Sequence, residues 1–121
     1  MKLALGTVQF GMPYGIANSK GQVTLEAAKL ILQYGKEANI DTLDTAIGYG
    51  DSEITLGKIG VFDWEIITKL PEIPENCRDV TKWINQEFAN SLDRLKIDQI
   101  RGLMLHSSMQ LLSPFGNEIW D

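Results

Sequence analysis

The segment that most constrains this chain is DTAIGYGDSE, which runs from Asp44 to Glu53. It follows a short apolar run, residues 40–43, that is typical of a β-strand, and it leads into a pattern typical of a helix. Asp44 is therefore expected where a strand ends, and Tyr49 on the turn that follows. In parallel α/β proteins, this junction between strand and helix carries the residues that do chemistry.

Two later residues occupy matching places in the sequence. Lys69 closes the run EIIT at residues 65–68, and His106 closes the run GLML at residues 102–105. The carboxyl ends of parallel strands share one face of the fold. We therefore expect Asp44, Tyr49, Lys69 and His106 to lie close together there. These four residues are called the quartet below.

The quartet suits the reduction of a carbonyl group. A free tyrosine has a pKa of about 10 and is a poor acid at neutral pH, whereas a nearby lysine ammonium favours the phenolate and lowers that pKa. An aspartate beside the lysine would hold it charged and in place. The tyrosine would then protonate a developing alkoxide, and the histidine would orient the carbonyl oxygen. Such a set supplies no reducing electrons, so a hydride-donating cofactor is required.

Four segments of the chain resemble the aldo-keto reductase family. They are GTVQFG at 6–11, DTAIGYGDSE at 44–53 with Leu56-Gly57 after it, ITK at 67–69, and LHS at 105–107. They come in the family's order and at about its spacing, over nearly the whole chain. The resemblance implies a (β/α)8 barrel, a TIM barrel, that uses NADPH or less often NADH. It also implies a small-molecule carbonyl substrate.

The resemblance also implies a role for each residue of the quartet. Tyr49 is the general acid, Lys69 and Asp44 tune it, and His106 helps to place the substrate. Asp44 and Thr7 are the residues expected to touch the nicotinamide end of the cofactor. Most contacts to the nucleotide come from the second half of the barrel in this family, and no basic cluster is expected here to hold an adenosine phosphate. The 121-residue chain is therefore expected to be inactive or nearly so by itself.

Two other functions stay open on the sequence alone. In the first, the chain is a catalytically inactive half-barrel that acts as an association module or is a fragment of a longer enzyme. In the second, Lys69 forms a Schiff base, as in a barrel aldolase or a pyridoxal enzyme. Its Asp and Tyr partners favour proton transfer instead. A metal hydrolase is not expected, because one histidine without a His-x-His or His-Glu-x-x-His motif leaves too few ligands.

The length of the chain conflicts with a complete barrel. It has 121 residues, with 44% hydrophobic and 22% charged, which is ordinary for one globular domain. A complete (β/α)8 barrel takes about 250 residues. We therefore expect a single domain over residues 1–121 that forms the N-terminal half of a barrel, about four βα units. It stops inside the first turn of a helix at 117–121, so it is expected to be incomplete at its C-terminus.

A half-barrel would leave two strand edges and its inner face open to water. Apolar residues are expected along these strands, namely Leu3, Leu5, Ile66, Leu103 and Leu105. An exposed patch of that kind drives association. We therefore expect a homo-oligomer that forms through the open barrel face, with two halves meeting around a two-fold axis.

Charge and cysteine content limit the partners and the compartment. The net charge of −5 argues against nucleic acid or an anionic membrane as a partner. Cys77 is the only cysteine, so no internal disulfide and no cysteine metal cluster is expected. The apolar run after Lys2 is too short for a secretory signal, and nothing later is expected to span a bilayer. A cytoplasmic protein is the default expectation.

The pattern of residues predicts four strands and three main helices. The strands are expected at 3–7, 40–43, 64–68 and 100–105. The helices are expected at 24–38 with Thr24 as its N-cap, at 52–59 with Gly60 as its stop, and over residues 80–95. Loops are expected at 9–21, 69–77 and 107–116. Trp64, Trp83 and Phe88 are interpreted as core, whereas Phe115 and Trp120 either line a substrate pocket or cover an exposed surface.

Overall fold

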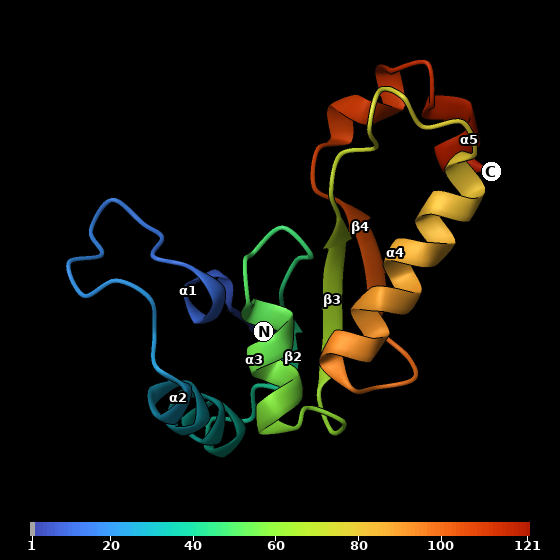
Figure 1. The fold of residues 1–121 in the computed structure, drawn as a ribbon. Coiled ribbons are helices and arrows are strands. Elements are labelled where there is room, and N and C mark those ends of the chain that lie inside the picture. The colour runs from blue at the N-terminus through green and yellow to red at the C-terminus, as the bar shows by residue number, and fades with distance from the viewer. Residues whose placement is uncertain (1) are drawn as a thin grey trace.

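A computed structural model describes residues 2–121 and shows one parallel sheet whose main helices pack against one of its faces (Figure 1). The four strands pair in the order β1-β2-β3-β4, which is also their order in the sequence. The elements are β1 (Ala4–Gly6), α1 (Val8–Gly11), α2 (Leu25–Glu37), β2 (Thr42–Asp44), α3 (Ser52–Ile59), β3 (Glu65–Leu70), α4 (Val80–Leu95), β4 (Gly102–Leu105), the 3₁₀ helix η1 (Ser108–Leu112) and α5 (Gly116–Trp120). The fold is α/β with four parallel strands, as the sequence predicted.

The helices begin and end where local chemistry favours it. The Thr24 hydroxyl accepts a hydrogen bond from the Ala27 N–H at 3.2 Å, which caps the start of α2. The Asp79 carboxylate does the same for α4 by accepting from the Lys82 N–H at 2.9 Å. Gly60, with φ at 91°, ends α3 in a conformation that disfavours other residues. Helices of residues 2–121 all lack the combination of length and apolar character that crossing a membrane requires.

Several predicted boundaries were wrong by a few residues. The second strand is Thr42–Asp44, so Asp44 is its last residue rather than the first residue after it. The third strand continues to Leu70 and therefore includes Lys69. The predicted loops at 9–21 and 107–116 are interrupted by the end of α1 and by η1. Such short segments lack a full period of hydrophobic pattern, which is why periodicity missed them.

The register of the sheet decides which side chains share a face, because paired residues point to the same side. Leu5, Leu43 and Ile66 form one row across β1, β2 and β3. This row faces the helices, since all three belong to or pack against the buried core that α2, α3 and α4 complete. The alternate rows, Asp44 beside Ile67 and Lys69 beside Met104, point to the opposite side. We call this opposite side the inner face.

Four of the five apolar residues expected along the strands do lie on them, but on the helix side of the sheet, so they do not form an exposed apolar patch on the inner face. Leu5 and Ile66 belong to the helix-facing row, and Leu3 precedes β1. Leu103 and Leu105 pair with Thr68 and Leu70, which places them on the helix side as well. Strands of a parallel sheet read as nearly continuous apolar runs, because both of their faces are normally covered. Alternation in the sequence therefore could not assign these residues to a face.

Candidate active site

The ion pair between Lys69 and Asp44 lies at the centre of the candidate site. Lys69 is on β3 and Asp44 is the last residue of β2, and their side chains meet on the inner face. The Lys69 ammonium also donates to the Thr45 carbonyl oxygen at 2.9 Å, and it lies 3.4 Å from the Tyr49 hydroxyl. The Lys69 side chain is 14% exposed and that of Asp44 is 41% exposed. The ammonium is therefore held from three sides, while the carboxylate remains accessible.

Tyr49 and His106 complete the group. Their rings meet edge to face, with centroids 5.7 Å apart and planes at 85°. The Lys69 ammonium lies 4.9 Å from the centre of the Tyr49 ring. His106 follows β4 directly, and its N–H donates to the Leu70 carbonyl oxygen at 2.9 Å. The structure thus brings all four residues of the quartet together at the carboxyl ends of β2, β3 and β4.

The turn that carries Tyr49 rests closely on α1. The Asp51 N–H donates to the Gly11 carbonyl oxygen at 3.2 Å. A Cβ atom at Gly11 would lie only 1.8 Å from the Tyr49 carbonyl oxygen, so no larger residue fits there without moving the turn. Gly50 has φ at 55° and meets Gly11 from the other side. The two glycines therefore allow the contact that sets the position of Tyr49.

A series of buried, hydrogen-bonded hydroxyl groups holds the Asp44 backbone in place. Thr7, Thr45 and Ser52 are all fully buried. The Thr45 hydroxyl lies 3.1 Å from the Ser52 hydroxyl, which donates to Thr7, and the Thr7 hydroxyl in turn donates to the Asp44 carbonyl oxygen at 3.0 Å. The Thr7 N–H donates to the same oxygen. These bonds tie the ends of β1 and β2 to the start of α3.

Thr7 contributes no exposed surface to the site. Its hydroxyl is used within the protein, between Ser52 and Asp44. As placed, it positions the Asp44 backbone, and a direct contact with a cofactor would require its hydroxyl to become exposed. The cofactor contact expected of Thr7 therefore stays a prediction, and Asp44 is the more accessible of the two residues.

Glu53, the last residue of the DTAIGYGDSE segment, has a role that the sequence did not indicate. Glu53 lies in the first turn of α3. Its side chain is 2% exposed, and its carboxylate accepts hydrogen bonds from Thr68, Ser91 and Arg94 at 2.7, 2.6 and 2.8 Å. These partners come from β3 and α4, so Glu53 links α3 to both elements.

The two aromatic residues near the C-terminus do not join the quartet. The Trp120 side chain is 82% exposed, and it lines a shallow apolar groove together with Leu103 and Ile119. Leu103 points to the helix side of the sheet, whereas the quartet lies on the inner face. Phe115 is half-buried between η1 and α5. Trp120 therefore does not line the candidate site. Its side chain is too exposed to shield the apolar groove from water.

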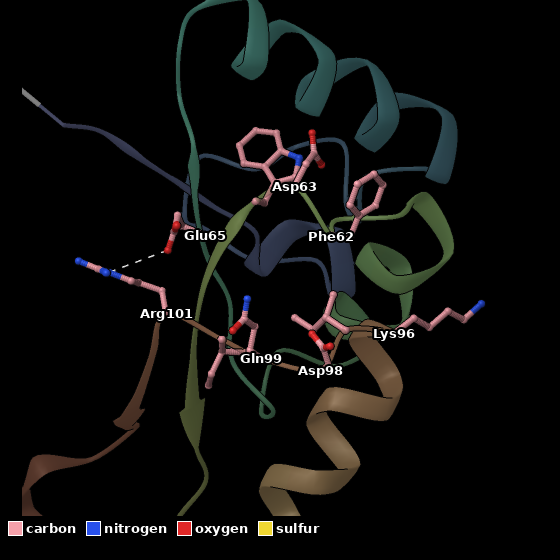
Figure 2. Close-up of a pocket in the computed structure, with 10 residues that line it drawn as sticks. Phe62, Asp63, Glu65, Lys96, Asp98, Gln99 and Arg101 are labelled. Atoms are coloured by element: carbon pink, nitrogen blue, oxygen red, sulfur yellow. Dashed lines mark ion pairs between the residues drawn. The ribbon is translucent and has the colours of Figure 1, made fainter.

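A groove that Figure 2 shows in close-up lies at the start of β3, whereas the quartet lies at the carboxyl ends of β2, β3 and β4. Its volume is about 830 Å³, and it is lined by residues 62–65 before and at the start of β3 and by residues 96–101 before β4. Glu65 and Arg101 face each other across it at 3.9 Å, and both are exposed. Catalytic residues of parallel barrels lie at the carboxyl ends of the strands. We therefore assign the candidate site to the quartet and not to this groove.

Comparisons with known proteins point to one family. A profile of the Aldo/keto reductase family matches residues 2–114. A crystal structure from Pseudomonas aeruginosa, provisionally described as an aldo-keto reductase, is similar with a TM-score of 0.75 and 26% identity, covering 97% of this chain and 48% of that one. A second, with the same description and organism, has a TM-score of 0.71 and 27% identity, covering 92% and 44%.

The chain therefore spans about half the length of the solved structures that it resembles. No protein with a curated description gave a significant match. The profile match extends over nearly the whole sequence, and the four-stranded parallel sheet is consistent with half of a TIM barrel. The chain belongs to the aldo/keto reductase family.

Proposed function

We propose that the quartet is the catalytic centre of an NAD(P)H-dependent reductase that converts an aldehyde or ketone to an alcohol. One observation supports this above all others. The Lys69 ammonium is paired with Asp44 and at the same time lies 3.4 Å from the Tyr49 hydroxyl, beside the His106 ring. A phenol, a cation and an imidazole thus converge on one accessible point of the inner face.

Each residue would act on the proton that the reaction needs. Tyr49 donates the proton to the alkoxide oxygen as it forms. The Lys69 ammonium then stabilises the phenolate that Tyr49 leaves behind, because it is already placed against the phenol oxygen. Asp44 keeps that ammonium in position, and His106 donates a hydrogen bond that orients the substrate oxygen. The hydroxyl chain behind Asp44 fixes this arrangement.

The residues present fit one end of the cofactor. A bound nicotinamide cofactor would supply the hydride. The Asp44 carboxylate, 41% exposed on the inner face, is the group in reach of a nicotinamide carboxamide or ribose. Lys69 is already paired with Asp44 and is not free to bind a phosphate. The support for a cofactor therefore comes from Asp44 and from the family. NADPH and NADH are not distinguished by these residues.

The Schiff-base alternative has less support. A lysine that attacks a carbonyl must be an uncharged amine in a desolvated pocket. Lys69 instead carries its charge against the Asp44 carboxylate and donates to the Thr45 carbonyl oxygen. This arrangement stabilises the ammonium, so it favours proton transfer over covalent catalysis.

A carbonyl reduction assay with a tyrosine variant tests the proposal. Consumption of NADPH by the full chain is followed with a panel of aldehydes and ketones. Tyr49→Phe should lower turnover by about 10²- to 10⁴-fold, since it removes the general acid, and it should leave cofactor affinity unchanged. Tyr14→Phe is the matched control, because that tyrosine is 57% exposed on the loop before α2.

Other outcomes of this assay decide between the remaining functions. A Tyr49→Phe variant with nearly full activity would remove Tyr49 as the acid. A wild-type chain that binds NADPH but reduces none of the carbonyls would favour the inactive half-barrel instead. The proposal also includes two expectations from the sequence. One is a cytoplasmic location, which the lone Cys77 suggested. The other is association with a second copy of the chain.

A further inference from the structure

Ser52 is fully buried, yet its hydrogen bonds reach the segments that carry the quartet. It is the first residue of α3 and has 0% exposure, so its side chain cannot touch a substrate or a cofactor. Its hydroxyl lies 2.9 Å from the Thr7 carbonyl oxygen and 3.1 Å from the Thr45 hydroxyl. Its backbone N–H donates to the Tyr49 carbonyl oxygen at 3.0 Å. Ser52 therefore contacts both the turn of Tyr49 and the residues around Asp44.

The three buried hydroxyl groups form a chain with a defined direction, because each hydroxyl has one proton to donate. The Thr7 proton goes to the Asp44 carbonyl oxygen at 3.0 Å, since a carbonyl oxygen can only accept. For the same reason, the contact between Ser52 and the Thr7 carbonyl oxygen requires the Ser52 proton. Ser52 is thereby left as an acceptor, so the Thr45 hydroxyl donates to it at 3.1 Å. The chain of hydrogen bonds therefore starts at Thr45 and ends at Asp44.

Both ends of this hydrogen-bond chain hold the Lys69 ammonium. Lys69 pairs with the Asp44 carboxylate and donates to the Thr45 carbonyl oxygen at 2.9 Å. Asp44 and Thr45 are adjacent in the sequence, so the hydroxyl groups brace the one segment that carries both acceptors. The Ser52 N–H at the same time holds the turn of Tyr49. One residue is therefore bonded to the supports of both the ammonium and the phenol.

The contact that these supports control is sensitive to small displacements. The Lys69 ammonium and the Tyr49 hydroxyl lie 3.4 Å apart, beyond the usual hydrogen-bond range of about 2.7–3.2 Å. A further separation would remove the interaction, whereas a small approach would strengthen it. Misplacement of a reacting group by about 1 Å can lower a reaction rate by about 10²-fold. The bonds that fix these two groups relative to each other therefore matter for the proposed proton transfer.

We propose that Ser52 is a positioning residue, whose hydroxyl sets the place at which the Lys69 ammonium and the Tyr49 hydroxyl meet. Its effect on turnover rests on the reductase function proposed above, whereas its effect on the position of these groups does not. Without the Ser52 hydroxyl, the buried Thr45 hydroxyl loses its acceptor and the Thr7 carbonyl oxygen loses a donor. The segment that carries the two acceptors of Lys69 is then expected to shift relative to Tyr49.

Kinetics of two matched serine variants test the proposal. Ser52→Ala should lower kcat for carbonyl reduction by about ten-fold, while KM and the Kd for NADPH change by less than about two-fold, because the residue touches neither ligand. Ser91→Ala is the control, since its hydroxyl is equally buried and donates to Glu53 at 2.6 Å. It should lose stability but keep the kcat of the wild type per folded molecule. A loss confined to KM in Ser52→Ala, or the same kcat in both variants, would overturn the proposal.

Two variants of Thr45 separate the effect of the hydroxyl chain from that of packing. Thr45→Val keeps the shape of the side chain and removes the hydroxyl that donates to Ser52, whereas Thr45→Ser keeps the hydroxyl and removes the methyl group. Because the hydroxyl chain sets the position, kcat should fall further in Thr45→Val than in Thr45→Ser. The opposite order would mean that packing decides, and it would overturn the proposal. This pair gives a result even if Ser52→Ala fails to fold.

A nuclear magnetic resonance signal of Tyr49 tests the positioning without any turnover. The three tyrosines of the chain are labelled with ¹³C at Cζ, and the Tyr49 signal is assigned by its absence in Tyr49→Phe. Ser52→Ala should move this signal, and Ser91→Ala should leave it in place. An unmoved signal in Ser52→Ala would overturn the proposal, whether or not the chain is a reductase. A moved signal in a chain that reduces no carbonyl of the panel would support the positioning role and contradict the reductase function alone.

Discussion

Two carboxylate–cation pairs, on opposite sides of the same sheet, differ in what surrounds them. The Glu53–Arg94 pair lies behind the sheet, where its carboxylate is 2% exposed and also accepts from two hydroxyl groups. The Asp44–Lys69 pair lies on the inner face, where the carboxylate is 41% exposed. Burial makes the first pair a link between elements. Access makes the second pair available to a ligand, so similar chemistry serves stability in one place and the proposed reaction in the other.

The difference is also visible in which atoms remain free. The Glu53 carboxylate already accepts hydrogen bonds from Thr68, Ser91 and Arg94, so it has little capacity for a further donor. Lys69 is fully engaged, but the phenol against which it lies is not. The inner pair therefore positions a third group, Tyr49, that can react. The outer pair has no such third group at a surface.

The largest expected effect on turnover comes from removing the cation of the inner pair, Asp44–Lys69. Lys69→Met should lower turnover by about 10²- to 10⁴-fold, because the Tyr49 phenolate loses its stabilising charge. The free energy of unfolding should change by less than about 1 kcal/mol, since water can solvate the accessible Asp44 carboxylate. Turnover of NADPH and chemical denaturation measure the two effects. A large loss of stability would mean that the inner pair is also structural.

Removing the cation of the outer pair should give the converse result. Arg94→Met leaves the buried Glu53 carboxylate with two hydroxyl donors and no counter-charge, which should cost about 2–3 kcal/mol of stability. A fully buried pair would cost about 3–5 kcal/mol, and the lower figure reflects the 30% exposure of the Arg94 side chain. Turnover per folded molecule should stay near that of the wild type. Denaturation midpoints measure the loss of stability, and turnover at low temperature, where the variant stays folded, measures activity separately.

Substitution of two glycines, one beside each pair, compares the same two regions with smaller expected effects. A Cβ at Gly57 would lie 2.0 Å from the Arg94 carbonyl oxygen, and one at Gly11 would lie 1.8 Å from that of Tyr49. Gly57→Ala and Gly11→Ala should each cost about 1–3 kcal/mol of stability, because backbone must move in both. Only Gly11→Ala should also reduce turnover, since it displaces the turn of Tyr49. Equal losses of turnover in both variants would contradict the separation of the two regions.

Sequence reasoning predicted that the four residues of the quartet lie close together, because the signals for each of them are local. Asp44 and Tyr49 lie in one ten-residue segment, and Lys69 and His106 each end an apolar run that predicts a strand. Parallel topology then brings such ends together, and the structure places all four within contact distance of a neighbour. The cap at Thr24 and the stop at Gly60 were also local signals, and both were confirmed.

The features that escaped prediction depend on contacts between distant segments. Glu53 is 41 residues from Arg94, and Ser52 is 45 residues from Thr7, so neither partner is implied by the local sequence. The face on which Leu103 and Leu105 lie is set by register with β3, which periodicity does not report. Gly11 reads as an ordinary loop residue until the Tyr49 turn is placed against it.

The most direct test of the account is a calorimetric titration of the full 121-residue chain with NADPH, repeated with Asp44→Asn as the comparison. The account predicts saturable binding, weakened by the Asp44 substitution, because the accessible Asp44 carboxylate is the proposed contact with the nicotinamide end of the cofactor. Absence of binding up to millimolar NADPH would contradict it. The quartet would then be a catalytic arrangement without its cofactor.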